Sequence, residues 1–369
     1  MTTVSNHKLI DSIKEQLEHV SDEPTKLPSD YRWESLDFTD DKTFQLTLSF
    51  VNKHYYEAEG FRHHYTEDLF RWITCRKPYD SYFNLGVMWK DQIVGYIHGR
   101  LSDFSIENKK SKVLEVILAC VIPPYRKKQL FNIMVKEMTR RAHLRDVKYG
   151  LFTTPYQVSD SYTAKIVYCH RILDLNECIK TGFTDEIEDS DRKRMLQKLY
   201  YPKEDDIKVP DNYKIIELEE KDIDRALGFL NRNLSQKLIH HIYTREEFIS
   251  TFISPEVKTY LLLKNNQMAS FSSFYIQPYL KLNDDSIVKS VIPLYHIGEQ
   301  IPFLFKYTFY QAKELGAIVA NIIATFIETR DQNEITNIKL SDGNGVLYMN
   351  IINYPEEIKS YNNIGTILF

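Results

Sequence analysis

Cysteine is scarce in this sequence, and the four residues that occur show no pairing pattern. Cys75, Cys120, Cys169 and Cys178 have neither CxxC spacing nor the framework of a disulfide-rich secreted domain. They are therefore predicted to be thiols in a reducing compartment, which indicates a cytoplasmic location. The sequence also contains no HExxH motif and no paired Cys/His ligand set, so we expect no metal.

Long apolar runs and a strong charge of either sign are also missing. The longest apolar stretch, residues 315–327, is too short to cross a bilayer and is interrupted by Asn321. The first residues, MTTVSNHKLID, show no signal-peptide pattern. A formal net charge of −4 offers no basic face to a phosphate backbone. We therefore expect no integral membrane segment and no nucleic-acid partner, and a monomer by default.

Apolar and aromatic residues, in contrast, are plentiful. Hydrophobic residues make up 43% of the 369 positions and aromatic residues 13%, which is ample material for a packed interior. This length predicts two domains or one large composite sheet.

One order of elements occurs twice along the chain. The first copy comprises a strand at Leu36 and Phe38, a helix from Asp40-Asp41, and a hairpin of strands 85–89 and 93–97 turning at Lys90-Asp91. The second comprises a strand at 213–218, a helix from Lys221-Asp222, and a hairpin of strands 260–263 and 271–276 turning at Asn265-Asn266. Repeated order predicts two related α/β units.

The boundaries of these units follow from composition. Residues 202–210 are polar and bounded by proline, so they are predicted to link an N-terminal half, residues 23–201, to a C-terminal half, residues 211–369. Apolar residues at helical spacing before residue 22 predict an N-terminal helical arm, residues 1–22. The predicted fold class is α/β, with two related halves forming one saddle-shaped mixed sheet flanked by helices.

The most informative local feature is an apolar strand, residues 113–121, that leads through Arg126, Lys127 and Lys128 into a helix beginning near residue 130. Cations at a helix N-terminus are unfavourable by roughly 0.3–1 kcal/mol each, whereas the amide groups there attract anions. A bound phosphate would resolve this conflict, and a solvated basic loop would avoid it. The residues alone leave both readings open.

The strand, basic turn and helix resemble those of acetyl-CoA-type transferases in general. A narrower resemblance, to the protein N-myristoyltransferase family, rests on several colinear motifs. They are Glu-Val-Ile-Leu-Ala-Cys-Val at 115–121 for E-I-N-F-L-C-V, Tyr-Cys-His-Arg at 168–171 for Y-W-H-R, Ser-Phe-Tyr at 273–275, residues 339–345 for K-F-G-x-G-D-G, and the ending 364–369. The resemblance covers about residues 23 to 369.

This resemblance implies a myristoyl-CoA:glycylpeptide acyltransferase that uses no metal. The backbone amides of Leu118 and Ala119 would form an oxyanion hole for the thioester, a contribution worth roughly 2.7–4 kcal/mol per donor. The implied acyl-CoA contacts are Cys120, Val121, Arg126, Lys127, Lys128, Gln129, Leu130 and Phe131. The implied contacts to an acceptor with an N-terminal glycine are Tyr55, Glu57, Glu59, Phe61, Tyr168, His170, Ser273 and Tyr295. Tyr168 and His170 could instead be core residues, and the two glutamates an ordinary solvated loop.

The α-carboxylate of Phe369 is the predicted catalytic base, with Thr154 orienting the amine. An N-terminal amine has a pKa near 8 and needs a proton acceptor at neutral pH, and no Ser/His/Asp set is evident. The ending 364–369 is apolar, so we expect it to be buried, where a carboxylate holds protons more strongly. The alternative is a terminal strand that only completes the sheet.

Some positions depart from the family pattern near the expected reaction centre. Ile117 replaces the signature asparagine, Asn344 replaces the aspartate of G-D-G, and residues 153–156 replace Y-T-A-G. A catalytically silent relative that binds acyl-CoA or acylated N-termini is therefore the alternative to an active enzyme. A general small-acyl acetyltransferase is a more distant alternative.

Overall fold

The computed structural model describes residues 20–55, 57–58, 60–126, 129–158, 162–323, 338, 340–354, 357–358 and 363–368. Residues 1–19, which include most of the predicted N-terminal helical arm, lie outside the described residues. Phe369 lies outside them as well. Within the described residues, no helix is both long and apolar enough to cross a membrane.

Helices and strands alternate along the chain as the α/β class requires. The helices are α2 (Asp41–His54), α3 (Glu67–Thr74), α4 (Leu130–His143), α5 (Leu175–Thr181), α6 (Ser190–Tyr200), α7 (Ile223–Leu234), α8 (Arg245–Phe252) and α9 (Ile301–Glu314). The strands are β1 (Tyr31–Ser35), β2 (Glu57–Ala58), β3 (Phe61–His63), β4 (Asn84–Trp89), β5 (Gln92–Ile106), β6 (Lys109–Val121), β7 (Tyr149–Thr154), β8 (Ala164–Ile172), β9 (Tyr213–Glu217), β10 (Ile239–His241), β11 (Val257–Lys264), β12 (Gln267–Lys281), β13 (Ile287–Gly298), β14 (Val319–Ile323), β15 (Ser341–Ile352) and β16 (Ile364–Gly365).

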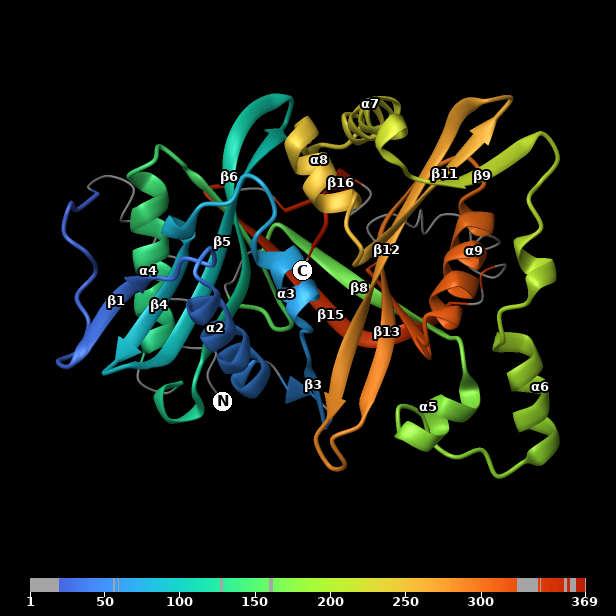
Figure 1. Ribbon diagram of the computed structural model, residues 1–369, viewed down its shortest axis with the longest axis horizontal. Coiled ribbons are helices and arrows are strands. Elements are labelled where there is room, and N and C mark those ends of the chain that lie inside the picture. Colours follow the sequence, from blue (N-terminus) through green and yellow to red (C-terminus); the bar gives the residue numbers. More distant parts are fainter. Residues whose placement is uncertain are drawn as a thin grey trace.

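These strands form one 16-stranded mixed sheet whose main path runs β1-β4-β5-β6-β7-β15-β8-β14-β13-β12-β11-β9 (Figure 1). The order β1-α2-α3-β4-β5-β6-α4-β7-β8 is repeated as β9-α7-α8-β11-β12-β13-α9-β14-β15. The last strands are exchanged, because β8 pairs with β14 and β15 pairs with β7. The predicted fold class, two related halves in one mixed sheet with flanking helices, is confirmed.

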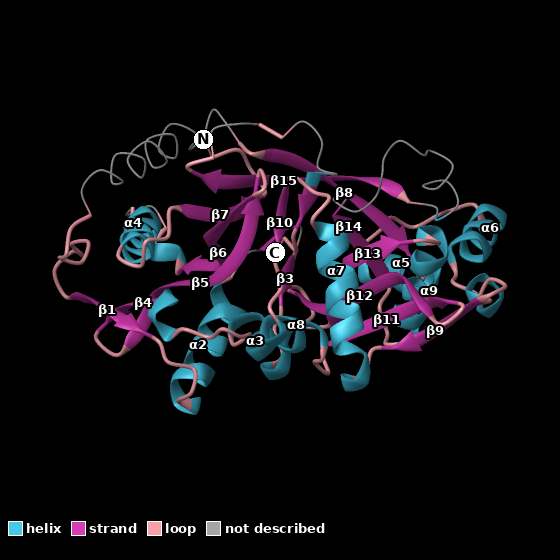
Figure 2. Ribbon diagram, turned by 90° about the horizontal axis from the view of Figure 1, so that it is seen from above, coloured by secondary structure: helices cyan, strands magenta, loops and turns pink. Residues whose placement is uncertain are grey.

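The helices cover both faces of the sheet. Residues of α2, α3, α7 and α8 share one hydrophobic core with β5, β6, β11 and β12, and Figure 2 shows α2, α3 and α8 below the sheet. On the opposite face, α4 packs on β4, β5 and β6. The approach of α4 is close: a Cβ at Gly95 of β5 would lie 2.6 Å from Sδ of Met134, so glycine is required there.

The local signals behind the predicted repeat are borne out. Asp40 caps α2 by accepting a 2.9 Å hydrogen bond from the amide of Thr43. Lys90 turns the β4–β5 hairpin with a φ of 54°, and Asn265 and Asn266 turn the β11–β12 hairpin with φ values of 50° and 65°. Paired positive φ values are typical of the type I′ turns that suit the twist of a hairpin.

The predicted strand at Leu36 and Phe38 is wrong. β1 ends at Ser35, and the Asp37 carboxylate then accepts from the amide of Thr39 at 3.0 Å and forms a turn. Both apolar side chains are buried in the core, so their alternation reflects burial within a loop. The proposed linker, residues 202–210, contains a short 3-10 helix, Glu204–Ile207, that packs against α9.

Candidate active site

A cavity of about 370 Å³ opens between α4 and β7 and extends across the end of β6. Its wall combines a helix face, the edges of two strands and several aromatic rings. The residues that line this wall include Tyr55, His63, Ile117, Leu118, Ala119, Phe131, Phe152, Thr154 and Tyr168. Its polar rim includes Thr139, His143 and Lys148.

The strands β6 and β7 separate at this cavity. Their parallel pairing ends at Val116 and Phe152, although β6 continues to Val121. The register between β5 and β6 shifts at the same level, so that Ile117 is an extra, bulged residue. A bulge re-aims the backbone of its strand, and an edge without a neighbour leaves peptide groups available to a ligand. The segment from Ile117 to Ala119 therefore borders the cavity with its backbone exposed on the β7 side.

The turn before α4 has an unusual backbone. Gln129 immediately precedes the helix with a φ of 58°, a conformation that favours glycine, and it makes no side-chain capping bond. Arg126 lies ahead of the helix and not in its first turn. Its Nε donates to the carbonyl of Val121 at 2.9 Å and its Nη2 to that of His54 at 2.8 Å. Arg126 thereby ties the end of β6 to the end of α2.

Cysteine nucleophiles are poorly supported here. Burial raises the pKa of Cys120, at the end of β6, to about 12, and the distant positive charges of Arg126 and Arg62 do not offset it. Burial likewise raises the pKa of Cys178 to about 12. A thiol with so high a pKa is protonated at neutral pH and is a weak nucleophile. The described residues also contain no cluster of three or more groups able to hold a metal ion.

Aromatic rings close the cavity on the side away from α4. Tyr55 and Tyr168 both reach its wall, and the ring of His63 lies 5.8 Å from that of Tyr55 and 4.8 Å from that of Tyr279. Removal from water lowers the pKa of His63 to about 4, so this ring is neutral at physiological pH. No local pattern in the sequence indicated His63, because its place depends on β3 pairing with β12 far along the chain.

Comparison with known proteins agrees with this geometry. Residues 10–164 match the family model of the myristoyl-CoA:protein N-myristoyltransferase N-terminal domain. A glycylpeptide N-tetradecanoyltransferase of Candida glabrata is 26% identical over 323 residues, covering 84% of this chain and 70% of the relative. One from Plasmodium falciparum is 26% identical over 365 residues, covering 96% and 86%. The chain is therefore similar to the N-myristoyltransferase family in its N-terminal half, and to glycylpeptide N-tetradecanoyltransferases over most of its length.

A solved structure extends the relationship to the fold. The crystal structure of Saccharomyces cerevisiae N-myristoyltransferase with bound myristoyl-CoA superimposes with a TM-score of 0.83 at 22% identity, covering 92% of this chain and 87% of that one. The shared fold therefore spans both halves of the chain.

Several residues expected from the N-myristoyltransferase resemblance meet at the cavity. They are Tyr55, Leu118, Ala119, Phe131, Thr154 and Tyr168. Cys120, Val121, Arg126, Gln129 and Leu130 adjoin it on β6 and the following turn without lining it. Lys127, Lys128, Glu59, Phe369 and the side chain of Glu57 lie outside the described residues.

The remaining acceptor candidates lie deeper in the fold or farther from the cavity. Ser273 and Tyr295 face each other across β12 and β13 and are fully buried, and the Tyr295 hydroxyl lies 3.1 Å from that of Tyr243. Phe61, on β3, packs beside a separate small cluster that includes Val288. None of the three lines the cavity.

His170 and Thr154 occupy defined positions near the exchanged strands. Nδ1 of His170 lies 2.8 Å from Oδ1 of Asn321 on β14, and a Cβ at Gly343 of β15 would strike the His170 ring. The Thr154 hydroxyl donates to the carbonyl of Tyr156 at 2.7 Å. In the sequence Asn321 is only an interruption of an apolar run, because its contact with His170 depends on the pairing of β8 with β14.

Proposed function

We propose that this protein transfers a myristoyl group from myristoyl-CoA to the N-terminal glycine amine of acceptor proteins by direct attack on the thioester. The observation that carries the proposal is the separation of β6 and β7 beside a bulge. It exposes the backbone of Leu118 and Ala119 to a cavity that joins the α4 turn to an aromatic wall.

The reaction needs little from side chains. The protonated amine of the acceptor loses a proton to a base, and the lone pair of the resulting neutral nitrogen then attacks the thioester carbon. The amides of Leu118 and Ala119 donate hydrogen bonds to the developing oxyanion. The carbon–sulfur bond breaks, the CoA sulfur leaves with the electron pair, and the second amine proton neutralises that thiolate. Protonated Cys120 fits this direct route better than one through an acyl-cysteine intermediate.

The base in this proposal is the α-carboxylate of Phe369, with Thr154 orienting the amine. The support is the end of the chain as far as it is described: Thr366, Ile367 and Leu368 are buried, with at most 5% of each side chain exposed. A chain end that enters the core brings its carboxylate with it, and burial raises carboxylate proton affinity.

The two halves divide the work in this scheme. The N-terminal half, residues 23–201, binds acyl-CoA through the turn at residues 126–131. The C-terminal half, residues 211–369, supplies peptide contacts and the terminal carboxylate, with residues 202–210 as the link and residues 1–22 as an arm. We place the enzyme in the cytoplasm as a monomer whose partners are acyl-CoA and proteins with an N-terminal glycine.

The decisive test is acyl transfer itself. The protein is incubated with myristoyl-CoA and a peptide beginning Gly-x-x-x-Ser, and the peptide is weighed by mass spectrometry. We expect one myristoyl group on the free peptide and none on the same peptide with an acetylated N-terminus. Binding of myristoyl-CoA without transfer to any glycine peptide would instead favour a catalytically silent relative.

A further inference from the structure

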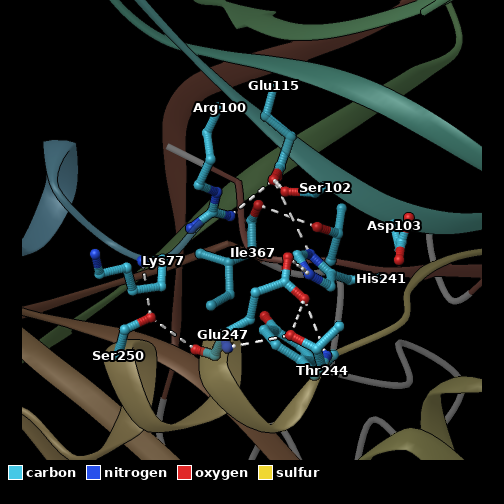
Figure 3. Close-up of polar contacts among 12 residues, drawn as sticks. Lys77, Arg100, Ser102, Asp103, Glu115, His241, Thr244, Glu247, Ser250 and Ile367 are labelled. Atoms are coloured by element: carbon cyan, nitrogen blue, oxygen red, sulfur yellow. Dashed lines mark hydrogen bonds and ion pairs between the residues drawn. The ribbon is translucent and has the colours of Figure 1, made fainter. Parts of the chain in front are cut away.

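A cluster of buried charges lies on the sheet face opposite α4, and the proposed chemistry does not use it. Its members are Arg100 on β5, Glu115 on β6, His241 on β10 and Glu247 at the start of α8, with at most 6% of each residue exposed. We refer to these four residues as the terminal clamp. Figure 3 shows their side chains converging from four separate elements.

The strongest link in the terminal clamp is a cross-strand ion pair. Arg100 and Glu115 are register partners, and Nη2 of Arg100 lies 2.7 Å from Oε1 of Glu115, which also accepts a hydrogen bond from the Ser102 hydroxyl. Burial, the largest single influence, would raise the pKa of Glu115, but Arg100, His241 and the Ser102 hydroxyl together outweigh it and lower the pKa to about 2. Glu115 is thus a carboxylate held by its neighbours two residues before the bulge at Ile117.

His241 connects that pair to a second carboxylate. Its Nδ1 lies 4.0 Å from Oε1 of Glu115 and its Nε2 lies 3.6 Å from Oε1 of Glu247. Neither ring nitrogen has a hydrogen-bond partner among the described residues. The ring is fixed by stacking on Tyr243 at 3.9 Å. Glu247 is itself anchored, because its Oε2 accepts from the amide and hydroxyl of Thr244 at 2.9 and 2.8 Å.

The strand that carries His241 also holds the end of the chain. β10 pairs with β5 on one side and with β16 on the other, through Ile239 to Ile364 and His240 to Gly365. β16 has no other strand partner in the part of the chain that the structure describes. Ile367 then enters the same hydrophobic core as Tyr243 and Leu118, and Figure 3 places it among the side chains of the terminal clamp.

Stability alone explains this arrangement poorly. Moving ions out of water costs several kcal/mol each, and a buried ion pair often contributes no more than well-packed apolar residues of similar volume. Buried ionic groups can, however, fix which segments meet and in what register. Here the segments are the β6 strand that leads to the proposed oxyanion hole and the β10–β16 pair that leads to the chain end.

We infer that Arg100, Glu115 and His241 are positioning residues that hold the C-terminal segment against β6. In the proposed mechanism these three residues contact neither acyl-CoA nor the acceptor. They act by keeping the terminal segment in line with the Leu118 and Ala119 amides, so their loss lowers the rate of transfer and leaves acyl-CoA binding intact. The expected loss of transfer rate rests on the proposed function. The expected loosening of the C-terminal segment does not, and it can be measured separately.

The test replaces the ionic pair by apolar residues of similar size. The triple variant Arg100→Met, Ser102→Ala, Glu115→Leu removes these three hydrogen-bonded groups together, and His241 keeps its contact with Glu247. We expect hydrogen exchange at the backbone amides of residues 364–368 to become about tenfold faster or more, with β5 and β6 still protected. We expect kcat to fall about tenfold or more, with the Kd for myristoyl-CoA changed less than about twofold.

Two further variants keep the outcome decisive. His241→Phe retains the stack on Tyr243 and removes only the nitrogens between the two carboxylates, and it should shift exchange and kcat in the same direction even if the triple variant does not fold. Glu137→Gln is the matched control. It alters an equally buried carboxylate, paired with Arg140 and Arg141 on α4, and should leave exchange at residues 364–368 and kcat unchanged.

The inference is overturned if the folded triple variant, or His241→Phe where the triple variant does not fold, shows wild-type exchange at residues 364–368. It is equally overturned if exchange accelerates in an active enzyme while kcat stays at the wild-type value. A wild-type protein that transfers no myristoyl group would sink the proposed function. The exchange measurement would still decide whether the terminal clamp holds the chain end.

Discussion

Gln129 and Ile117 illustrate how single residues mark the site through their backbone. Gln129 adopts a left-handed conformation before α4, and Ile117 is the extra residue in the β6 bulge. Neither side chain is suited to acid, base or nucleophilic chemistry. Both positions border the place where a thioester would lie between helix and strand. Loss of the asparagine at position 117 is therefore compatible with a mechanism that relies on main-chain donors.

Gly343 is a residue whose smallness has a specific consequence. A Cβ there would meet the ring of His170 and would lie 2.8 Å from the carbonyl oxygen of Tyr168. Gly343→Ala should therefore displace both His170 and Tyr168, which are proposed acceptor contacts and of which Tyr168 lines the cavity. We expect the KM for a glycine peptide to rise about fivefold or more, with the Kd for myristoyl-CoA unchanged, as determined by steady-state kinetics and direct titration.

A second glycine serves as the control for that substitution. Gly228 lies within α7, and a Cβ there would meet nothing within 4 Å. Gly228→Ala should leave both constants unchanged and raise the free energy of unfolding by about 0.5–1 kcal/mol, because alanine favours helix. Equal KM values for the two variants would remove His170 and Tyr168 from the acceptor site.

At the scale of elements, the turn between β6 and α4 contains one arginine that makes hydrogen bonds within the fold and two lysines that are proposed to bind phosphate. Arg126 is engaged with the carbonyls of Val121 and His54, so its removal would disturb the frame of the site. Lys127 and Lys128 test phosphate binding more cleanly. The double variant Lys127→Ala, Lys128→Ala should raise the Kd for myristoyl-CoA about tenfold at low salt, and less at high salt because screening weakens the wild-type contact.

The comparison for this turn needs an equal loss of charge elsewhere. Lys26→Ala, Lys42→Ala removes two exposed lysines on other parts of the surface and should leave the Kd unchanged at any ionic strength. An unaltered Kd in the Lys127/Lys128 variant, measured by titration at low salt, would place the CoA phosphates elsewhere.

The terminal segment is the second element whose geometry carries a prediction. β16 pairs with β10, and Thr366, Ile367 and Leu368 after it are buried. Two residues appended after Phe369 should reduce kcat about a hundredfold, because they remove the carboxylate from its place, while the Kd for myristoyl-CoA stays within about twofold. Semisynthetic amidation of Phe369 should act in the same way without adding bulk. Full activity in both proteins would exclude the carboxylate and direct attention to a side-chain base such as His170.

For the whole molecule, the sequence predicted what depends on neighbours in the chain. The repeated order of elements, the hairpin turns at Lys90 and Asn265, and the cap of α2 all follow from short stretches, and each is found in the structure. The exchange of β8 and β15 between the halves had no local signal, since it depends on pairings between residues far apart in sequence.

The residues of the candidate site also fall into those that a local motif predicts and those that only the folded chain brings together. Leu118 and Ala119 could be placed because a contiguous motif carries them, and the cavity runs along that motif. His63 and the terminal clamp could not be placed, because each is assembled from strands and helices that meet only in the folded chain. The strand predicted at Leu36 and Phe38 was wrong, because an alternating apolar pattern in a buried loop resembles that of a strand.

Buried histidines set the acid limit of the whole fold. His98 and His296 are each 3% exposed, and burial lowers the pKa of both to about 3, against an ordinary value of 6.5. The folded protein therefore keeps both rings neutral where the unfolded chain has begun to protonate them. A group with a depressed folded pKa contributes stability above its unfolded pKa, and that contribution is lost as the pH falls.

We accordingly expect the free energy of unfolding in urea to be flat above about pH 7.5 and to fall between about pH 6.5 and pH 4.5, by up to about 1.4 kcal/mol per pH unit for each histidine. His296→Gln keeps a polar group beside Thr308, which lies 3.0 Å from Nε2 of His296, and removes the titration of one buried histidine. In this variant the free energy of unfolding should change less steeply with pH between about pH 6.5 and pH 4.5, by the contribution of about one proton. Its urea midpoint at neutral pH should be lower, because the stack of His296 on Phe305 is lost. Carboxylates such as Glu115, whose pKa is about 2, release their contribution only at still lower pH and cannot mimic the effect. A free energy that stays constant from pH 7 down to pH 5, or an unchanged slope in His296→Gln, would show that these rings are protonated in the folded protein.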